Sequence, residues 1–293
     1  MPNFISLSPI DHYYGKPINP AITSPSELRD KIASYFGHYR GNITVQGRAA
    51  ITALLEHLGL KREDEVWIMT TFNFPNVSSH VTATIFNICK PSRVLTENTR
   101  AIFVIHEFGI PHPEILNLKK IAKKRGIPLI EDCAHTLSSY NKDYRVGTVG
   151  DYVIISFPKI FPVKWGGALL GEEVDYFPSP IDEGCIIECC PLVYEMWDSL
   201  EDIAEARRAV FRKLTEGVKG IGLAPLFEVS DSISPWFFPL PTPQWQELIV
   251  ASMERGVECT QWYGREMVIL PCHQYLGDYE IARIIESIKI CHI

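Results

Sequence analysis

The feature that most constrains the fold is a series of short, continuous apolar runs between residues 66 and 170, separated by helix-like stretches. Runs that are apolar throughout, rather than at alternate positions, are typical of strands buried on both faces. Strands that alternate with helices predict an α/β fold with a mostly parallel sheet flanked by helices. The expected strands are 66–72, 101–108, 129–132, 152–157 and 167–170.

The positions of turn-forming residues and the hydrophobic periodicity divide the chain into three predicted parts. Residues 1–25 are rich in turn-forming residues and show no helical or strand periodicity, so we expect an extended N-terminal arm. Residues 26–175 carry the strand–helix alternation and predict a large α/β domain. Residues 176–293 begin with a Pro-containing connector at 176–180 and predict a smaller C-terminal α+β domain. Helices are expected from the Ser24–Glu27 capping box to Gly37 and at 47–57, 113–124, 198–218, 243–256 and from 278 onward.

Composition excludes several classes of partner. A formal net charge of −7 argues against nucleic acid or an anionic membrane surface. The chain contains no apolar run long enough to span a bilayer, and its start lacks signal-peptide features, so we expect a cytoplasmic protein. The eight cysteines are scattered without a C-x-x-C pair, which predicts reduced thiols and no metal site.

The candidate catalytic residues lie at the end of the predicted strand 129–132 and in the stretch that follows it. Asp132 should emerge at the carboxyl end of that strand, the edge at which open parallel sheets bind ligands. Lys159 lies in an apolar, proline-containing stretch, an unusual place for a surface lysine, and Lys164 is its rival. An acid and a lysine of this kind could serve pyridoxal phosphate (PLP), whose enzymes need both. His106 ends another strand at the same edge, where it could line the pocket or make structural hydrogen bonds.

Other residues could hold the phosphate and the ring of this cofactor. Gly47 and Arg48 open a predicted helix, and helix N-termini favour phosphate. Ser156 ends the strand before Lys159 and could donate its hydroxyl to a phosphate oxygen. Phe74 could stack on a flat ring, although core packing is the commoner role of a single Phe. His135 could reach a ring hydroxyl.

Five motifs occur in an order that resembles the DegT group of PLP-dependent nucleotide-sugar aminotransferases, which have fold type I. The resemblance covers most of the chain, from about residue 26 to 290. The motifs are Glu131-Asp132-Cys133-Ala134-His135, Gly147-Thr148-Val149-Gly150-Asp151, Ser156-Phe157, Lys159 and Gly166-Gly167.

The resemblance implies an activity and a set of roles. Members pass an amino group, usually from glutamate, to a keto-sugar carried on a nucleotide, and they are homodimers with active sites at the interface. The implied roles are the Schiff-base lysine and general base for Lys159, the ring-nitrogen partner for Asp132, the ring-hydroxyl contact for His135, phosphate binding for Ser156, Gly47 and Arg48, and ring stacking for Phe74.

Several positions depart from the family pattern. Lys164-Trp165 stands where the family has Gly-Glu, and Gln46-Gly47-Arg48 stands where it has Ser-Gly-Thr. Two residues fewer separate Ser156 from Lys159, the segment between 86 and 99 is short, and no clear G-x-N-x-R segment occurs. The departures leave two alternatives open, which are another PLP-dependent reaction on a smaller substrate and a non-catalytic relative.

Overall fold

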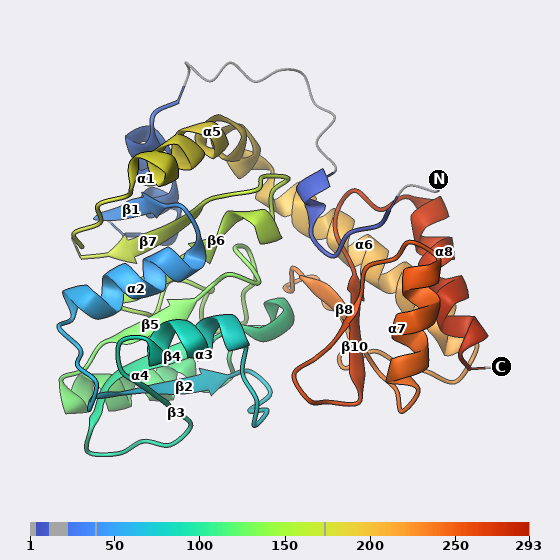
Figure 1. Ribbon diagram of the computed structural model, residues 1–293, viewed down its shortest axis with the longest axis horizontal. Coiled ribbons are helices and arrows are strands. Elements are labelled where there is room, and N and C mark those ends of the chain that lie inside the picture. The colour runs from blue at the N-terminus through green and yellow to red at the C-terminus, as the bar shows by residue number, and fades with distance from the viewer. Residues whose placement is uncertain (1–3, 12–22, 39, 173, 293) are drawn as a thin grey trace.

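The computed structural model describes residues 4–11, 23–38, 40–172 and 174–292. Most of the predicted arm at 1–25 lies outside the described residues. The described chain builds a seven-stranded sheet in the order β1-β7-β6-β5-β4-β2-β3, and Figure 1 shows it beside a smaller sheet. The strands of the large sheet are β1 Arg40–Thr44, β2 Glu65–Thr70, β3 Lys90–Ser92, β4 Thr99–Ile105, β5 Leu129–Asp132, β6 Tyr152–Ser156 and β7 Gly167–Gly171.

The large sheet is mostly parallel, which confirms the predicted fold class. Strands β3, β2, β4, β5 and β6 run parallel to one another. Strand β7 is antiparallel to β6, because only a short loop carrying Lys159 joins them, and β1 is antiparallel to β7. The carboxyl ends of β4, β5 and β6 therefore meet at one edge of the sheet.

Alternating side chains of the central strands bury both faces of the large sheet. Ile154 packs with helices α2 and α3, whereas Val153 and Ile155 pack with α1 and α5 on the opposite face. Helix α1 begins at the predicted capping box of Ser24 and Glu27 and ends at Gly37, which has a left-handed backbone. The helices that cover this sheet are α1 Pro25–Phe36, α2 Gly47–His57, α3 Ser79–Phe86, α4 Ile115–Arg125 and α5 Pro180–Met196.

The C-terminal part is a three-stranded antiparallel sheet, in the order β8-β10-β9, covered by helices. Helix α6 runs from the large sheet toward this small sheet (Figure 1), and it packs against α8. Its apolar positions recur at helical spacing, so one side of it is buried along its length. These elements are α6 Leu200–Lys219, β8 Phe237–Pro241, α7 Trp245–Glu254, β9 Thr260–Gln261, β10 Met267–Pro271 and α8 Asp278–Ile290.

Several elements were not expected from the sequence, namely β1, α3, β3, α5, β9 and β10. Strand β1 follows α1 directly, and its Arg-Gly-Asn start hides the strand pattern. Helix α5 contains Pro191 and begins inside the predicted connector, yet its buried side chains join the core of the large sheet. The division of the chain at residue 175 stays a prediction. Among the described residues, no helix combines the length and apolar character needed to cross a membrane.

Candidate active site

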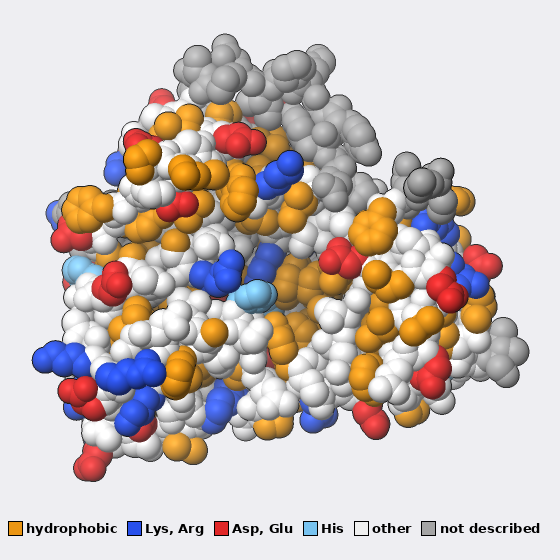
Figure 2. Space-filling model, in the orientation of Figure 1, with side chains coloured by type: hydrophobic (Ala, Val, Ile, Leu, Met, Phe, Trp, Pro, Cys, Tyr) orange, Lys and Arg blue, Asp and Glu red, His pale blue; other side chains and the backbone are white. Residues whose placement is uncertain are grey.

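A cavity of about 500 Å³ lies between the two sheets. Figure 2 shows it as a hollow with Lys, Arg and His side chains at its rim and hydrophobic side chains along one wall. Residues of α2, α3 and the ends of β5 and β6 line it on the large-sheet side, and residues of β8, β9 and β10 line it on the other. Six of the seven predicted site residues line this cavity, namely Gly47, Arg48, Asp132, His135, Ser156 and Lys159.

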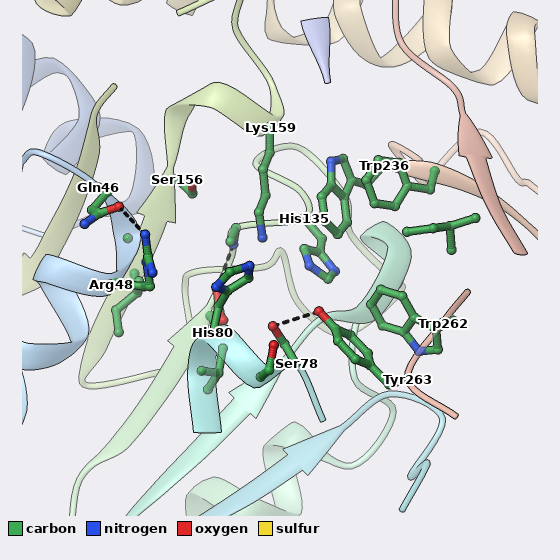
Figure 3. A pocket seen from close by; sticks show the side chains of 18 of the residues that line it. Gln46, Arg48, Ser78, His80, His135, Ser156, Lys159, Trp236, Trp262 and Tyr263 are labelled. Carbon is green, nitrogen blue, oxygen red and sulfur yellow. Dashed lines mark hydrogen bonds between the residues drawn. The ribbon is translucent and has the colours of Figure 1, made fainter. Parts of the chain in front are cut away.

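Lys159 reaches into the cavity from a short 3-10 turn, Phe157–Lys159, that follows β6 directly. Its side chain is partly exposed, and that exposure is to the cavity (Figure 3). The Nζ atom lies 4.3 Å from the ring centroid of Trp236. Burial lowers the pKa of the Lys159 amine to about 8, against the opposing charge of Asp132. A lysine with such a pKa is partly unprotonated near neutral pH, as a nucleophile or general base requires.

Asp132 ends β5 and is buried on the floor of the cavity. Its Oδ1 accepts the amide N–H of Ala134 at 2.9 Å, and no described residue donates a hydrogen bond to its Oδ2. Burial raises the pKa of Asp132, while the Lys159 charge acts in the opposite direction. A carboxylate in this position has an oxygen free to accept a hydrogen bond from a cationic ligand.

His135 stands one turn beyond Asp132 and forms part of the same floor. Its ring lies against the Trp236 ring, with centroids 3.8 Å apart, and its Nδ1 accepts the amide N–H of Phe108. Burial and the nearby Lys159 amine hold the pKa of His135 well below its usual range, so the ring is neutral. Because Nδ1 is an acceptor, the proton of the neutral ring is on Nε2.

The other end of the cavity is formed by the first turn of α2 and the end of β6. Gln46, the residue before the helix, makes no side-chain cap, so among the described residues no side chain accepts from the amides of Gly47 and Arg48. Gly47 lies against Ser156, since a Cβ built at Gly47 would be 3.4 Å from the Ser156 Cβ. The arrangement of helix terminus, hydroxyl and Arg48 guanidinium suits an anion such as a phosphate group.

Phe74 does not line this cavity. Its ring stacks on Phe72 with centroids 5.4 Å apart, and it borders a separate cavity beside Arg265. His80, in the first turn of α3, instead lines the main cavity, and Figure 3 shows its ring opposite the Lys159 amine. The sequence held one signal for His80, which is its place directly after Ser78 and Ser79 at a helix start.

Three aromatic residues of the C-terminal part were also missed. Trp236, Trp262 and Tyr263 form the wall on that side, and the Tyr263 hydroxyl donates to Ser78 Oγ at 3.0 Å (Figure 3). Nothing in the local sequence marks them as pocket residues rather than core. Lys164 is exposed and does not line the cavity, which leaves Lys159 as the lysine beside Asp132.

His106 and Glu131 form a buried support beneath the site rather than part of its surface. His106 Nδ1 accepts the amide N–H of His112, so its Nε2 donates to Glu131 Oε2 at 2.9 Å. Glu131 also accepts backbone N–H groups of Gly147, Val149 and Gly150. Burial alone would raise the pKa of Glu131, but these donors hold it below its usual value. The Glu131 carboxylate thus fixes the glycine-bounded turn that packs beside β5.

Comparisons with known proteins match this fold and the part of the chain that forms the large sheet. A model of the DegT/DnrJ/EryC1/StrS aminotransferase family matches residues 24–171, just over half of the chain. The chain belongs to this family. The predicted resemblance is therefore confirmed, and the matched range contains every residue predicted for the site.

Curated members of the DegT/DnrJ/EryC1/StrS family share moderate identity with the chain. L-glutamine:scyllo-inosose aminotransferase from Streptomyces griseus is 29% identical over 164 residues, which are 50% of this chain and 38% of that protein. GDP-perosamine synthase from Escherichia coli O157:H7 is 31% identical over 125 residues, or 38% of this chain and 34% of that protein. The chain thus matches about two fifths or less of the length of these relatives.

Solved structures of the family extend the likeness to nearly the whole chain. The DegT DnrJ EryC1 StrS aminotransferase from Brucella abortus superimposes with a TM-score of 0.73 at 17% identity, covering 91% of this chain and 90% of that one. Spr1654 from Streptococcus pneumoniae, in its PLP-form, gives 0.73 at 16% identity and covers 97% and 94%. These likenesses confirm the predicted fold, which is that of the family.

Proposed function

We propose that the chain is a PLP-dependent aminotransferase that transfers an amino group from an amino acid, such as glutamate or glutamine, to a keto-sugar or cyclic polyol ketone. One observation carries the proposal. A lysine amine with a lowered pKa and a buried carboxylate face one cavity, and an uncapped helix terminus with a serine stands at its other end. Family membership and the donors and acceptors named in the relatives support it.

The residues of the cavity fit PLP by the chemistry of their donors and acceptors. The first turn of α2, Ser156 and Arg48 would hold the phosphate, and Asp132 Oδ2 would accept the N–H of the ring. His135 would reach the ring hydroxyl and His80 would cover the ring face, in the role expected of Phe74. PLP supplies an aldehyde that bonds to an amine and a cationic ring that withdraws electrons from the substrate carbon.

The side chains of this chain would move the proton and exclude water. Lys159 Nζ would hold the cofactor through its aldehyde, with loss of water, and as a free amine would be the base that moves a proton at the substrate α-carbon. Asp132 would hold the ring nitrogen protonated. Trp236 keeps one side of the amine apolar, which excludes water and keeps the amine pKa low.

We also propose that the protein works as a cytoplasmic homodimer, as in the family. Support comes from exposed apolar side chains near α2, because Phe177 is 87% exposed beside a groove that Arg48 also lines. All eight cysteines are free, as is common in reducing compartments. Sedimentation equilibrium with and without PLP tests the dimer, and a monomer under both conditions would contradict it.

The experiment for the main proposal is borohydride reduction of the protein mixed with PLP, followed by peptide mapping. We expect one equivalent of cofactor on the peptide that contains Lys159, none on Lys164, and loss of the label in Lys159→Ala but not in Lys164→Ala. In a separate, unreduced sample that carries PLP, glutamate or glutamine should bleach the visible absorbance of the bound cofactor. Failure to retain PLP would favour a non-catalytic relative. Retention without any reaction with amino donors would favour another PLP chemistry.

A further inference from the structure

Helix α6 carries a fully buried arginine that points toward the turn of Lys159. Arg207 is 0% exposed, although a guanidinium is among the groups most costly to remove from water. No described carboxylate pairs with it, and burial lowers the pKa of its guanidinium to about 10. A buried charge without a counter-ion is kept only where neutral acceptors surround it.

The acceptors around Arg207 are the backbone oxygens of the Lys159 turn. Its Nη2 donates to the carbonyl oxygen of Lys159 at 2.9 Å and contacts that of Ile160 at 3.4 Å. Its Nε donates to Gln274 Oε1 at 2.9 Å, and Gln274 Nε2 donates to the Ile160 oxygen at 2.8 Å. Two side chains from the C-terminal part therefore hold two successive carbonyls beside the reactive lysine.

The turn needs these donors because it is too short to satisfy its own carbonyls. Its internal backbone bonds run from Ile160 and Phe161 to the Phe157 oxygen, and Pro158 has no N–H to donate. The carbonyls of Lys159 and Ile160 therefore depend on Arg207 and Gln274.

Arg207 also reaches the opposite wall of the cavity. Its Nη1 contacts the carbonyl oxygen of Pro235 at 3.5 Å, and Pro235 directly precedes Trp236. The Trp236 ring packs on His135 and lies over the Lys159 amine. One guanidinium thus joins the segment that carries the amine to the segment that carries its apolar cover.

We propose that Arg207 is a positioning residue that sets the distance between the Lys159 turn and the Trp236 segment, and so keeps the lysine amine pointed into the cavity against Asp132. The catalytic part of this statement rests on the proposed function. The geometric part does not, because the amine can be observed in the cofactor-free protein.

The test measures the titration of the Lys159 amine in cofactor-free protein by competitive labelling with an amine reagent across pH, followed by mass spectrometry of the peptide that contains it. The charged or titratable groups that face this amine, Asp132, His135 and His80, are unchanged in every variant. We expect a midpoint near pH 8 in the parent protein. In Arg207→Met the turn loosens and the amine gains water, so the midpoint should rise by at least about one pH unit toward that of an ordinary lysine.

Two further variants separate the effect of the Arg207 hydrogen-bond geometry from the effect of its positive charge and from the effect of removing any buried arginine of α6. Arg207→Lys keeps the positive charge but loses the forked donor, so a smaller rise in the same direction shows that geometry matters. Arg208→Met removes a neighbouring arginine of α6 that is 5% exposed and pairs with Glu201 and Glu205, without contact to the Lys159 turn. Its midpoint should equal that of the parent protein.

A parent-like midpoint in folded Arg207→Met would overturn the proposal. Should Arg207→Met not fold, Arg207→Lys and Gln274→Leu decide, and parent-like midpoints in both would overturn it. With PLP and an amino donor, Arg207→Lys should lower kcat at least about tenfold while the donor KM changes less than about threefold. If the parent protein retains no PLP, the proposed function fails, whereas the titration still decides the role of Arg207.

Discussion

Gly167 offers a direct test of how tightly the predicted phosphate end of the site is built. It begins β7, and a Cβ placed on it would lie 2.5 Å from the carbonyl oxygen of Ile155 and 2.9 Å from the amide nitrogen of Gly47. Both are backbone atoms, so neither can turn aside. An ordinary carbon–oxygen contact begins at about 3.3 Å, so Gly167→Ala must separate β7 from β6 or from α2 by roughly 0.8 Å.

Overpacking of this kind costs about 1–3 kcal/mol, which corresponds to a fall in Tm of roughly 2–5 °C for a chain of this size. The displacement also falls on the amide of Gly47, in the first turn of α2. Loss of one charge-assisted hydrogen bond to phosphate costs about 1.5–3 kcal/mol, so the Kd for PLP should rise about ten- to a hundredfold.

Thermal unfolding followed by circular dichroism measures the first effect, and titration of PLP followed by absorbance measures the second. Gly184→Ala is the matched control, because Gly184 lies inside helix α5 and a Cβ there meets nothing within 4 Å. That change should raise stability by about 0.5–1 kcal/mol and leave PLP binding unchanged. A Gly167→Ala variant that is as stable as the parent protein and binds PLP equally well would refute the reasoning.

Two further predictions concern the floor and the cover of the cavity. Asp132 raises the pKa of the Lys159 amine and so offsets part of the effect of burial. In cofactor-free Asp132→Asn this carboxylate is absent, so the pKa of the amine should fall below about 8 and its labelling midpoint should move to lower pH. A midpoint at higher pH would show that Asp132 does not act on Lys159. His80→Ala should weaken PLP binding about two- to tenfold at unchanged Tm, because a ring contact of this kind contributes about 0.5–1.5 kcal/mol, whereas Phe74→Ala should lower Tm and leave the Kd unchanged. Weaker PLP binding in Phe74→Ala together with unchanged PLP binding in His80→Ala would show that Phe74 stacks on the ring.

Much of the fold and part of the site follow from local sequence. The apolar runs predict the parallel strands because residues buried on both faces must be apolar along their whole length. The capping box at Ser24 and the glycine at 126 set helix ends through contacts within a few residues. Asp132 and Lys159 could be placed at one edge because the carboxyl ends of parallel strands meet there.

Other features depended on contacts between distant segments. Phe74 faces Phe72 and Arg265 instead of the cavity, and the backbone of the intervening Asn73, with φ of 51°, is not readable from composition. Trp236 comes to the amine only because the C-terminal sheet packs across from β5 and β6.

The sequence by itself predicted the central parallel strands, the ligand-binding edge at their carboxyl ends, and Asp132 and Lys159 at that edge with Lys164 as the rival lysine, since these depend on side-chain pattern and short-range geometry. Only the tertiary structure decided what surrounds them. Arg207 follows Lys159 by 48 positions, and its hydrogen bonds to the carbonyls of that turn exist because α6 packs behind it. The sequence pattern indicates whether a residue is buried and in which type of element it lies, whereas the packing of helices and sheets decides which residues it contacts.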